Sequence, residues 1–298
     1  MPPISIIIPC YNYAAYIGET LASIEGEIGK EDEVIIIDDG STDQTQDIVG
    51  KWIEGKPSFS YYSQENSGPA AARNAGLDQA KNPYAYLLDA DDRPLPGRLN
   101  VLKQTADAHP EAAMIIGGHM TFDASGKEKT HPVGSLSVDR EKNFVAYAIK
   151  KDFGIANGGC VLIKTGIARK YRYPEQLHVS EDICFYSWVL ANHPCVTFDE
   201  IILKVRKHEN SLRHRVDLYE KVVGVLPEVL FASKHMPSDF RKYQEAFEQH
   251  LLLSLFRAQF NARKKKEARA TYLQALREKP ALILDWSYFS KFVRTLFS

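Results

Sequence analysis

The stretch "EVIIIDDGSTDQTQDIVGKWI" (residues 33–53) decides the fold class, because it runs from a strand through an acidic turn into a helix. Its first six residues, 33–38, form a β-branched run without polar alternation, which is typical of a strand buried on both faces of a parallel sheet. Ser41 or Thr42 can cap the helix that follows, and Asp43 is favourable in its first turn. The stretch predicts one strand–turn–helix unit with carboxylates at the end of its strand.

The same unit recurs on both sides of this stretch. Runs typical of strands lie at 4–9, 59–63 and 84–88, and runs typical of helices lie at 14–25 and 68–80. The alternation of strand and helix over about 90 residues predicts a doubly wound α/β fold, with a mostly parallel sheet and helices on both faces. In such sheets, ligands bind at the carboxyl ends of the strands.

The pattern is less regular after residue 110. Further strands are expected at 112–120, 158–164, 196–198 and 201–206, and a helix is expected at 181–193. Beyond about residue 215 the sequence is typical of helices. We therefore divide the chain into a catalytic domain, residues 1–210, and a helical C-terminal region, residues 211–298.

Composition places the protein among ordinary globular chains. It has 298 residues, of which 44% are hydrophobic, and no apolar run approaches the roughly 18–20 residues that span a bilayer. The first residues lack the basic start and long apolar stretch of a secretion signal. The four cysteines show no paired spacing, which is typical of a reducing compartment. We expect a cytoplasmic protein.

Charge is distributed unevenly along the chain. Residues 201–298 hold nineteen Lys and Arg against ten Asp and Glu, whereas the whole chain has a net charge of −1. A basic region beside an acidic body favours an anionic partner surface, although a solvated helical surface explains it equally well. Residues 281–297 mix aromatic side chains with Lys291 and Arg294, as interfacial helices do. Contact with the inner face of the membrane, packing on the catalytic domain and a homodimer all stay open. We expect no nucleic-acid partner.

Three carboxylates follow the strand at 84–88. In an extended chain Asp89 and Asp91 point to the same side, and two such carboxylates suit Mg²⁺ or Mn²⁺, whose remaining ligands are often substrate phosphates. Alternatively, Asp91 and Asp92 cap the next helix and Asp89 is merely exposed. The spacing alone leaves both interpretations open.

The other strand ends carry polar side chains of their own. Asp39 can accept a hydrogen bond from a nucleobase, and Tyr11 can stack on a base or pack against a neighbour. Asn12 tolerates a turn conformation. Arg73 lies in a helix of small residues and can reach a phosphate or a carboxylate, or be an ordinary surface residue.

Two later segments are also candidates. Glu181 and Asp182 begin a helix, either as simple N-terminal acidic residues beside a capping Ser180 or as a general base. The basic run 204–215 can ligate a metal through His208 or hold a diphosphate through its cations, and as a charge run alone it suits solvated surface.

The order of these motifs resembles that of family 2 glycosyltransferases, which have the GT-A fold. The motifs are "SIIIPCYNYAAYIGETLASI", "DEVIIIDDGSTDQT", "QENSGPAAARNAGLDQA", "YLLDADD" and "SEDICFYSW". The resemblance implies an inverting transfer of a sugar from a UDP-sugar to a hydroxyl of a glycan or lipid-linked saccharide, with Mn²⁺ or Mg²⁺. It covers about two thirds of the chain and includes the last third poorly.

The resemblance also implies roles for individual residues. The nucleotide pocket would be formed by Pro9, Tyr11, Asn12 and Asp39. Arg73 and Asp89 would bound the ribose and sugar of the donor, and Asp91 would ligate the metal, with Asp92 structural. Asp182 would be the base, with Glu181 beside it. The segment 206–211 resembles the part of the family that closes over the diphosphate, which makes His208 a second metal contact.

One departure from the family limits the activity. The Q-x-x-R-W motif of membrane-embedded synthases does not occur after residue 182. A processive membrane polymerase is therefore not expected, while a soluble enzyme of polysaccharide biosynthesis is. The alternative class is a catalytically inactive nucleotide-sugar-binding or scaffold protein, against which the presence of all four motif carboxylates argues.

Overall fold

The N-terminal part of the chain builds the parallel half of one sheet. In the computed structural model, which describes residues 1–208 and 216–297, four strands run parallel in the order β3-β2-β1-β4. They are β1 (Ile4–Cys10), β2 (Glu33–Asp38), β3 (Phe59–Ser63) and β4 (Tyr84–Leu87). Every residue of β1 and β4 is buried, which confirms the prediction from their uninterrupted apolar runs.

The later strands extend this sheet with mixed directions. The order continues β8-β6-β9-β5 beyond β4, and β7 pairs with β6. These strands are β5 (Arg93–Pro94), β6 (Met114–Phe122), β7 (Glu128–His131), β8 (Val161–Lys164) and β9 (Cys195–Arg206). β8 is antiparallel to both β4 and β6, whereas β9 is parallel to β6. The predicted α/β class is confirmed, and the sheet is mixed in its second half.

One continuous strand, β9, replaces the two short strands expected at 196–198 and 201–206. Its register against β6 shifts around Gly118, where the pairing is irregular. A Cβ atom on Gly117 or Gly118 would stand 2.9 Å from Ile202 or Ile201, so two glycines in β6 let β9 approach this closely. The apolar pattern that predicts a strand is interrupted between residues 198 and 201. This interruption coincides with the irregular pairing, where the strand bends.

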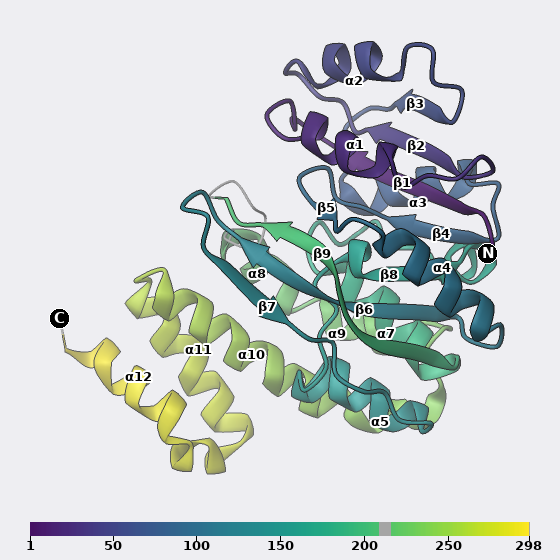
Figure 1. Ribbon diagram of the computed structural model, residues 1–298. Helices are drawn as coiled ribbons and strands as arrows, with labels where there is room; N and C mark the ends of the chain where they lie inside the picture. The colour runs from purple at the N-terminus through teal and green to yellow at the C-terminus, as the bar shows by residue number, and fades with distance from the viewer. Residues whose placement is uncertain (209–215, 298) are drawn as a thin grey trace.

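Helices cover both faces of the sheet (Figure 1). α1 and α4 lie in front of it in Figure 1, and α3 and α7 lie behind. The helices of this part are α1 (Ile17–Glu25), α2 (Thr45–Ile53), α3 (Pro69–Gln79), α4 (Arg98–Ala108), α5 (Arg140–Phe144), α6 (Thr165–Tyr171) and α7 (Glu181–Asn192). A π-helix (Val145–Lys150) follows α5, and a short 3₁₀ turn (Gly158–Cys160) precedes β8.

The C-terminal region is helical, as the sequence predicts. It contains α8 (Val216–Val223), α9 (Leu226–Phe231), α10 (Gln244–Asn261), α11 (Lys265–Glu278) and α12 (Trp286–Leu296), with 3₁₀ segments at Ser238–Tyr243 and Pro280–Leu284. Phe231, Phe247 and Leu251 belong to the same buried core as the sheet, whereas Tyr272 joins a second cluster around α11 and α12. Helices α8–α10 therefore pack on the N-terminal part through one shared hydrophobic core. The domain boundary at residue 210 stays a prediction.

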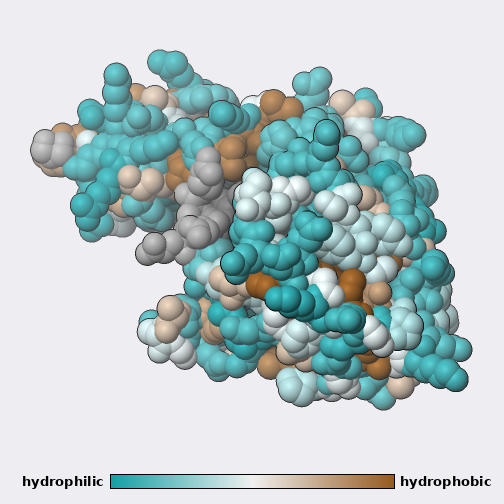
Figure 2. Space-filling model, turned by 90° about the horizontal axis from the view of Figure 1, so that it is seen from above, coloured by the Kyte–Doolittle hydropathy of each residue, from teal (hydrophilic) through white to brown (hydrophobic). Residues whose placement is uncertain are grey.

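The last helices stand apart from the sheet. From above they form a lobe beside the main body, with hydrophobic surface gathered where the two meet (Figure 2). Within residues 1–208 and 216–297, no helix combines the length and apolar composition needed to cross a bilayer.

Two expected helix caps are wrong. Residue Gln44, not Ser41 or Thr42, stands at the start of α2, and the Oδ1 atom of Asp43 accepts a hydrogen bond from the backbone of Thr45 at 2.9 Å. Ser180 precedes α7 in the left-handed region (φ 64°) and makes no capping hydrogen bond. The Ser41 side chain instead accepts from the backbone N–H of Asn12 at 2.9 Å, which ties the end of β1 to the loop after β2.

The close packing of α3 on the sheet predicts the effect of one substitution. A Cβ atom at Gly76 would stand 2.2 Å from the Cγ2 atom of Ile7, so Gly76→Ala should destabilise the protein by about 1–3 kcal/mol. Gly50 lies exposed within α2 with open space around it, so Gly50→Ala should stabilise by about 0.5–1 kcal/mol. Urea unfolding of both variants measures the difference, and equal effects would contradict this packing.

Candidate active site

The ends of β1 and β2 are joined by one asparagine. Asn12 has φ 59°, the left-handed turn conformation that its side chain tolerates. Its Oδ1 atom accepts hydrogen bonds from the backbone N–H groups of Thr42 at 2.7 Å and Asp43 at 3.2 Å. These bonds fix the loop after β2 against the loop after β1, so Asn12 shapes this edge of the sheet through its own conformation.

Asp39 organises the neighbouring loop. Its carboxylate is buried and accepts hydrogen bonds from Gln64 Nε2 at 2.7 Å and from the backbone N–H groups of Ser67 at 2.9 Å and Gly68 at 2.8 Å. An ionised carboxylate offers about four acceptor positions, so three protein donors leave roughly one free. Asp39 therefore holds the loop that leads into α3, and its predicted contact with a nucleobase stays a prediction.

A cavity of about 630 Å³ opens over these strand ends. All eight residues that the sequence analysis assigns to the donor or the metal line it: Pro9, Tyr11, Asn12, Asp39, Arg73, Asp89, Asp91 and His208. Tyr11 is 44% exposed, so its ring is free for contact with a ligand. The structure thus brings together residues spread over 200 positions of the sequence, as the strand-end argument requires.

Arg73 lies at the centre of the site and pairs with two carboxylates. Its Nη2 atom is 2.9 Å from Asp89 Oδ1, and its Nη1 atom is 2.5 Å from Glu181 Oε1. The guanidinium also lies over the ring of Tyr173, 5.4 Å from its centroid. The side chain is only 12% exposed, and the two carboxylates raise its pKa although burial opposes this. The structure pairs Arg73 with carboxylates, and its contact with a donor phosphate stays a prediction.

Glu181 and Asp182 begin α7 on the far side of Arg73. Burial first, and then the charge of Glu181, raise the pKa of Asp182 to about 7, although the charge of Arg73 opposes both effects. Within the described residues, its Oδ1 atom accepts one hydrogen bond, from the backbone N–H of Ile183 at 2.9 Å. Asp182 lines a second cavity of about 1020 Å³, which shares Arg73 and Asp89 with the first. A carboxyl that titrates near neutral pH beside a large cavity is suited to accept a proton.

Asp91 and His208 form a pair in the wall of the smaller cavity. The Nε2 atom of His208 is 2.8 Å from Asp91 Oδ2, and both side chains are about nine-tenths buried. Burial and the charge of Asp89 raise the pKa of Asp91, which His208 opposes. The Nδ1 atom of His208 is buried, and no described residue hydrogen-bonds to it. Asp91 caps no helix, because Gly97 stands at the start of α4.

This pair would supply a divalent ion with one carboxylate and one imidazole ligand. In the part of the chain that the structure describes, no three His, Cys, Asp or Glu side chains gather as a complete metal site. Mg²⁺ and similar ions are commonly held by one or two carboxylates together with substrate phosphates. Asp91 Oδ2 and His208 Nε2, which are 2.8 Å apart, would be the two protein donor atoms for such an ion when a diphosphate completes its shell.

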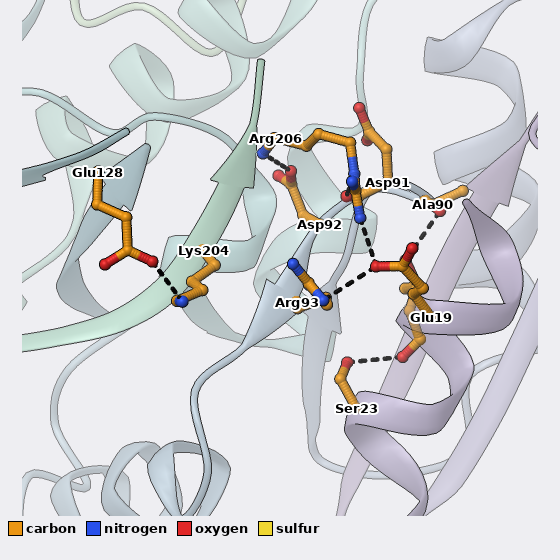
Figure 3. Close-up of polar contacts among 10 residues, drawn as sticks. Glu19, Ser23, Ala90, Asp91, Asp92, Arg93, Glu128, Lys204 and Arg206 are labelled. Atoms are coloured by element: carbon orange, nitrogen blue, oxygen red, sulfur yellow. Dashed lines mark hydrogen bonds and ion pairs between the residues drawn. The ribbon is translucent and has the colours of Figure 1, made fainter. Parts of the chain in front are cut away.

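Asp92 has a structural environment that differs from that of Asp91. It accepts hydrogen bonds from the Asn157 side chain and, at 2.9 Å, from the backbone N–H of Arg206. Arg206 and Arg93 both reach Glu19 on α1, at 2.7 and 2.9 Å, as Figure 3 shows. This network fastens the end of β9, and with it His208, to the acidic turn. Residues 209–211 of the predicted closing segment and the basic residues up to 215 lie outside the described residues.

Sequence reasoning missed several residues of these cavities. Asn157, Tyr13 and Tyr16 line the smaller cavity, and Lys151 and Arg257 line the larger one. Asn157 follows an irregular segment, and Arg257 lies on a helix more than 60 residues after the last motif. Only their position in space identifies them.

Residues 5–172 match the sequence pattern of glycosyl transferase family 2, and the chain belongs to that family. An uncharacterized glycosyltransferase of Haemophilus influenzae is 27% identical over 82% of this chain and 99% of its own length. A GalNAc(5)-diNAcBac-PP-undecaprenol beta-1,3-glucosyltransferase of Campylobacter jejuni is 33% identical over 43% of each chain. The chain therefore spans less than half the length of this second relative.

Two solved structures have the same fold. S. aureus TarS 1–349 in complex with UDP-GlcNAc superposes with a TM-score of 0.63 at 19% identity, covering 98% of this chain and 89% of that one. The mannosyltransferase PcManGT from Pyrobaculum calidifontis, in complex with GDP-Man and Mn²⁺, superposes with a TM-score of 0.60 at 19% identity. The superposition covers 99% of this chain and 84% of that one. At this identity the likeness establishes the fold, GT-A, which confirms the expected architecture.

Removing Arg73 should cost much more stability than removing an exposed arginine. Arg73→Ala leaves Glu181 and Asp89 close together without their cation, and breaking a buried pair typically costs about 3–5 kcal/mol. Arg172, which pairs with Asp78 at 2.7 Å with both side chains more than 40% exposed, provides the control. Arg172→Ala should cost under about 1 kcal/mol. Urea unfolding of both variants measures these values, and similar losses would contradict a central role for Arg73.

Proposed function

We propose that this glycosyltransferase transfers a sugar with inversion from a UDP-sugar to a hydroxyl group of a saccharide or lipid-linked acceptor. The observation that carries the proposal is the meeting of two cavities at Arg73 and Asp89, with Asp182 on one wall and the Asp91–His208 pair on the other. A donor in the smaller cavity and an acceptor in the larger one would meet at this point.

The reaction proposed is a single displacement at the anomeric carbon. Asp182 takes the proton of the acceptor hydroxyl as its oxygen bonds to the anomeric carbon, and the bond from that carbon to the diphosphate oxygen breaks. UDP leaves with the bonding electron pair, and the configuration inverts. Glu181 acts through Arg73, because their ion pair fixes the start of α7 relative to Asp89.

The donor would lie across the strand ends. Tyr11 is exposed and available to stack on the base, beside Pro9 and Asn12, and the remaining acceptor position of Asp39 would take the ring N–H. Asp91 and His208 would hold Mn²⁺ or Mg²⁺. When bound, such an ion neutralises charge that develops on the leaving diphosphate. The TarS and PcManGT complexes, whose ligands are UDP-GlcNAc and GDP-Man with Mn²⁺, support a nucleotide-sugar donor and a metal.

We also propose the kind of sugar, the location of the reaction and the contacts of the C-terminal lobe. A hexose or N-acetylhexosamine would be transferred in the assembly of a polysaccharide, in the cytoplasm. The C-terminal lobe would contact either the inner face of the membrane or a second copy of the chain, since Leu284 is 84% exposed and Trp286 and Phe297 are each 73% exposed. The relative from Campylobacter jejuni, whose acceptor carries PP-undecaprenol, supports a lipid-linked acceptor.

The rate should depend on the ionisation of Asp182. Because its raised pKa is about 7, the carboxyl is protonated below neutral pH and cannot accept a proton. Release of UDP from a UDP-sugar should therefore fall about tenfold per pH unit below 7 and level off above it. Asp182→Asn should lower the rate by about 10²–10⁴ and abolish this dependence, while UDP binding is retained. Wild-type turnover in the variant would exclude Asp182 as the base.

Metal-dependent donor binding should depend on Asp91. Asp91→Asn removes the one ionisable oxygen ligand of the pair, so calorimetry with Mn²⁺ should find UDP binding weakened by about tenfold or more, and binding without metal nearly unchanged. Asp107→Asn, on the exposed face of α4, has the same charge change and serves as the control. An equal gain in affinity from Mn²⁺ in the wild type and Asp91→Asn would contradict the assignment.

A further inference from the structure

The larger cavity is lined by basic residues that the proposed reaction does not use. Asp182 and Glu181 also line it, and so does one face of α10. If the proposed function holds, this is the space that the acceptor enters, because it reaches Asp182 and opens toward Asp89. The other residues that line this cavity therefore indicate the chemistry of the acceptor.

A polar stripe on α10 faces this cavity. His250, Ser254, Arg257 and Asn261 follow one another at spacings of four, three and four residues, so they lie on one face of the helix, and all four line the cavity. Ser254 Oγ is 3.3 Å from His250 Nε2 and 3.4 Å from Arg257 Nη2. Other positions of α10 enter the core through apolar side chains. The helix therefore presents hydrogen-bonding groups to the cavity where packing alone would favour apolar ones.

Lys151 adds a second cation from another element. It ends the π-helix with φ 55°, a conformation that costs a non-glycine residue roughly 1–2 kcal/mol. The pKa of Lys151 is lowered, first by burial and then by the positive charge of Arg257. The pKa of His250 is lowered to about 4 by burial, Lys151 and Arg257. Lys151 and Arg257 are therefore near enough to repel each other, and His250 is neutral at pH 7.

Neither of these two cations has an ion-pair partner among the described residues. Among residues 1–208 and 216–297, no carboxylate lies within ion-pair distance of Lys151 or Arg257. Arg257 is oriented by the ring of Tyr288 on α12, 5.6 Å from its guanidinium carbon. Asp182 acts on Lys151 only at longer range, and Glu181 and Asp89 pair with Arg73. The wall of the cavity thus carries both the carboxylates assigned to the reaction and two cations, Lys151 after the π-helix and Arg257 on α10.

We propose that the acceptor carries a phosphoryl group, which binds between Lys151 and Arg257 while its hydroxyl reaches Asp182. A phosphate monoester carries about −1.5 to −2 charges at pH 7, which matches two cations, whereas one carboxylate would leave a cation unbalanced. Arginine binds phosphate oxygens through two parallel N–H groups, and the Ser254 hydroxyl and Asn261 amide add further donors. Binding the anion also relieves the repulsion between the two cations.

The experiment measures binding of inorganic pyrophosphate to the full-length protein with UDP at a saturating concentration and without Mn²⁺, which pyrophosphate would chelate. UDP occupies the donor site, so heat released by pyrophosphate reports a second site. Arg257→Gln and Lys151→Gln should each weaken this binding by about tenfold or more. Arg277→Gln, on the exposed surface of α11, has the same charge change and should leave it unaltered. No second site, or equal weakening in all three variants, would overturn the proposal.

Two further ligands identify the source of the phosphoryl group. N-acetylglucosamine 1-phosphate represents a soluble acceptor, and N-acetylglucosamine linked through diphosphate to a fifteen-carbon prenol represents a lipid-linked one. Equal affinities favour a soluble phosphorylated acceptor, tenfold tighter binding of the prenyl compound favours a lipid, and binding of neither overturns the proposal. Metal-dependent release of UDP from UDP-sugars by the wild type tests the proposed function separately, so that failure of one claim is distinguished from failure of the other.

Discussion

The double ion pair of Arg73 is the interaction on which the rest of the site depends. One guanidinium, largely buried in α3, joins Asp89 at the end of β4 to Glu181 at the start of α7. These two elements are more than 90 residues apart and carry groups that we propose for the donor side and the acceptor side. Two carboxylates so close together would repel without this cation, and the arginine would be costly to bury without them. Fixing their distance fixes where the two cavities meet.

Around this centre, each loop at the sheet edge is held by a hydrogen bond from a different strand end. Asn12 joins the loops after β1 and β2, Asp39 holds the entry to α3, and Asp92 receives the end of β9. These groups are occupied by the protein, so the site is organised before a ligand arrives. Tyr11, the remaining acceptor position of Asp39, the Asp91–His208 pair and the carboxyl of Asp182 are the groups that we propose for contact with ligands. Preorganisation of this kind lowers the entropy lost on binding.

Much of this could be predicted from the sequence, and the limits have physical causes. The apolar runs of β1, β2 and β4 indicated buried parallel strands, and Asp39, Asp89 and Asp91 follow from the strand ends. The double ion pair of Arg73 could not be predicted, because Glu181 is brought to it only by tertiary packing. Ser180 lies in a left-handed conformation that its residue type does not favour. No sequence motif identifies Arg257 or Lys151, because their position in the cavity depends on how α10 packs on the π-helix.

The central claim is that one displacement occurs between these cavities with Asp182 as its base, and the anomeric configuration of a trapped product tests it most directly. Methanol can replace the acceptor, because the methyl glycoside formed does not interconvert between anomers. Proton NMR of the product from an α-linked UDP-sugar, with Mn²⁺, should show the β-glycoside. An α-glycoside would mean retention, which requires a different arrangement of reacting groups and would contradict the account.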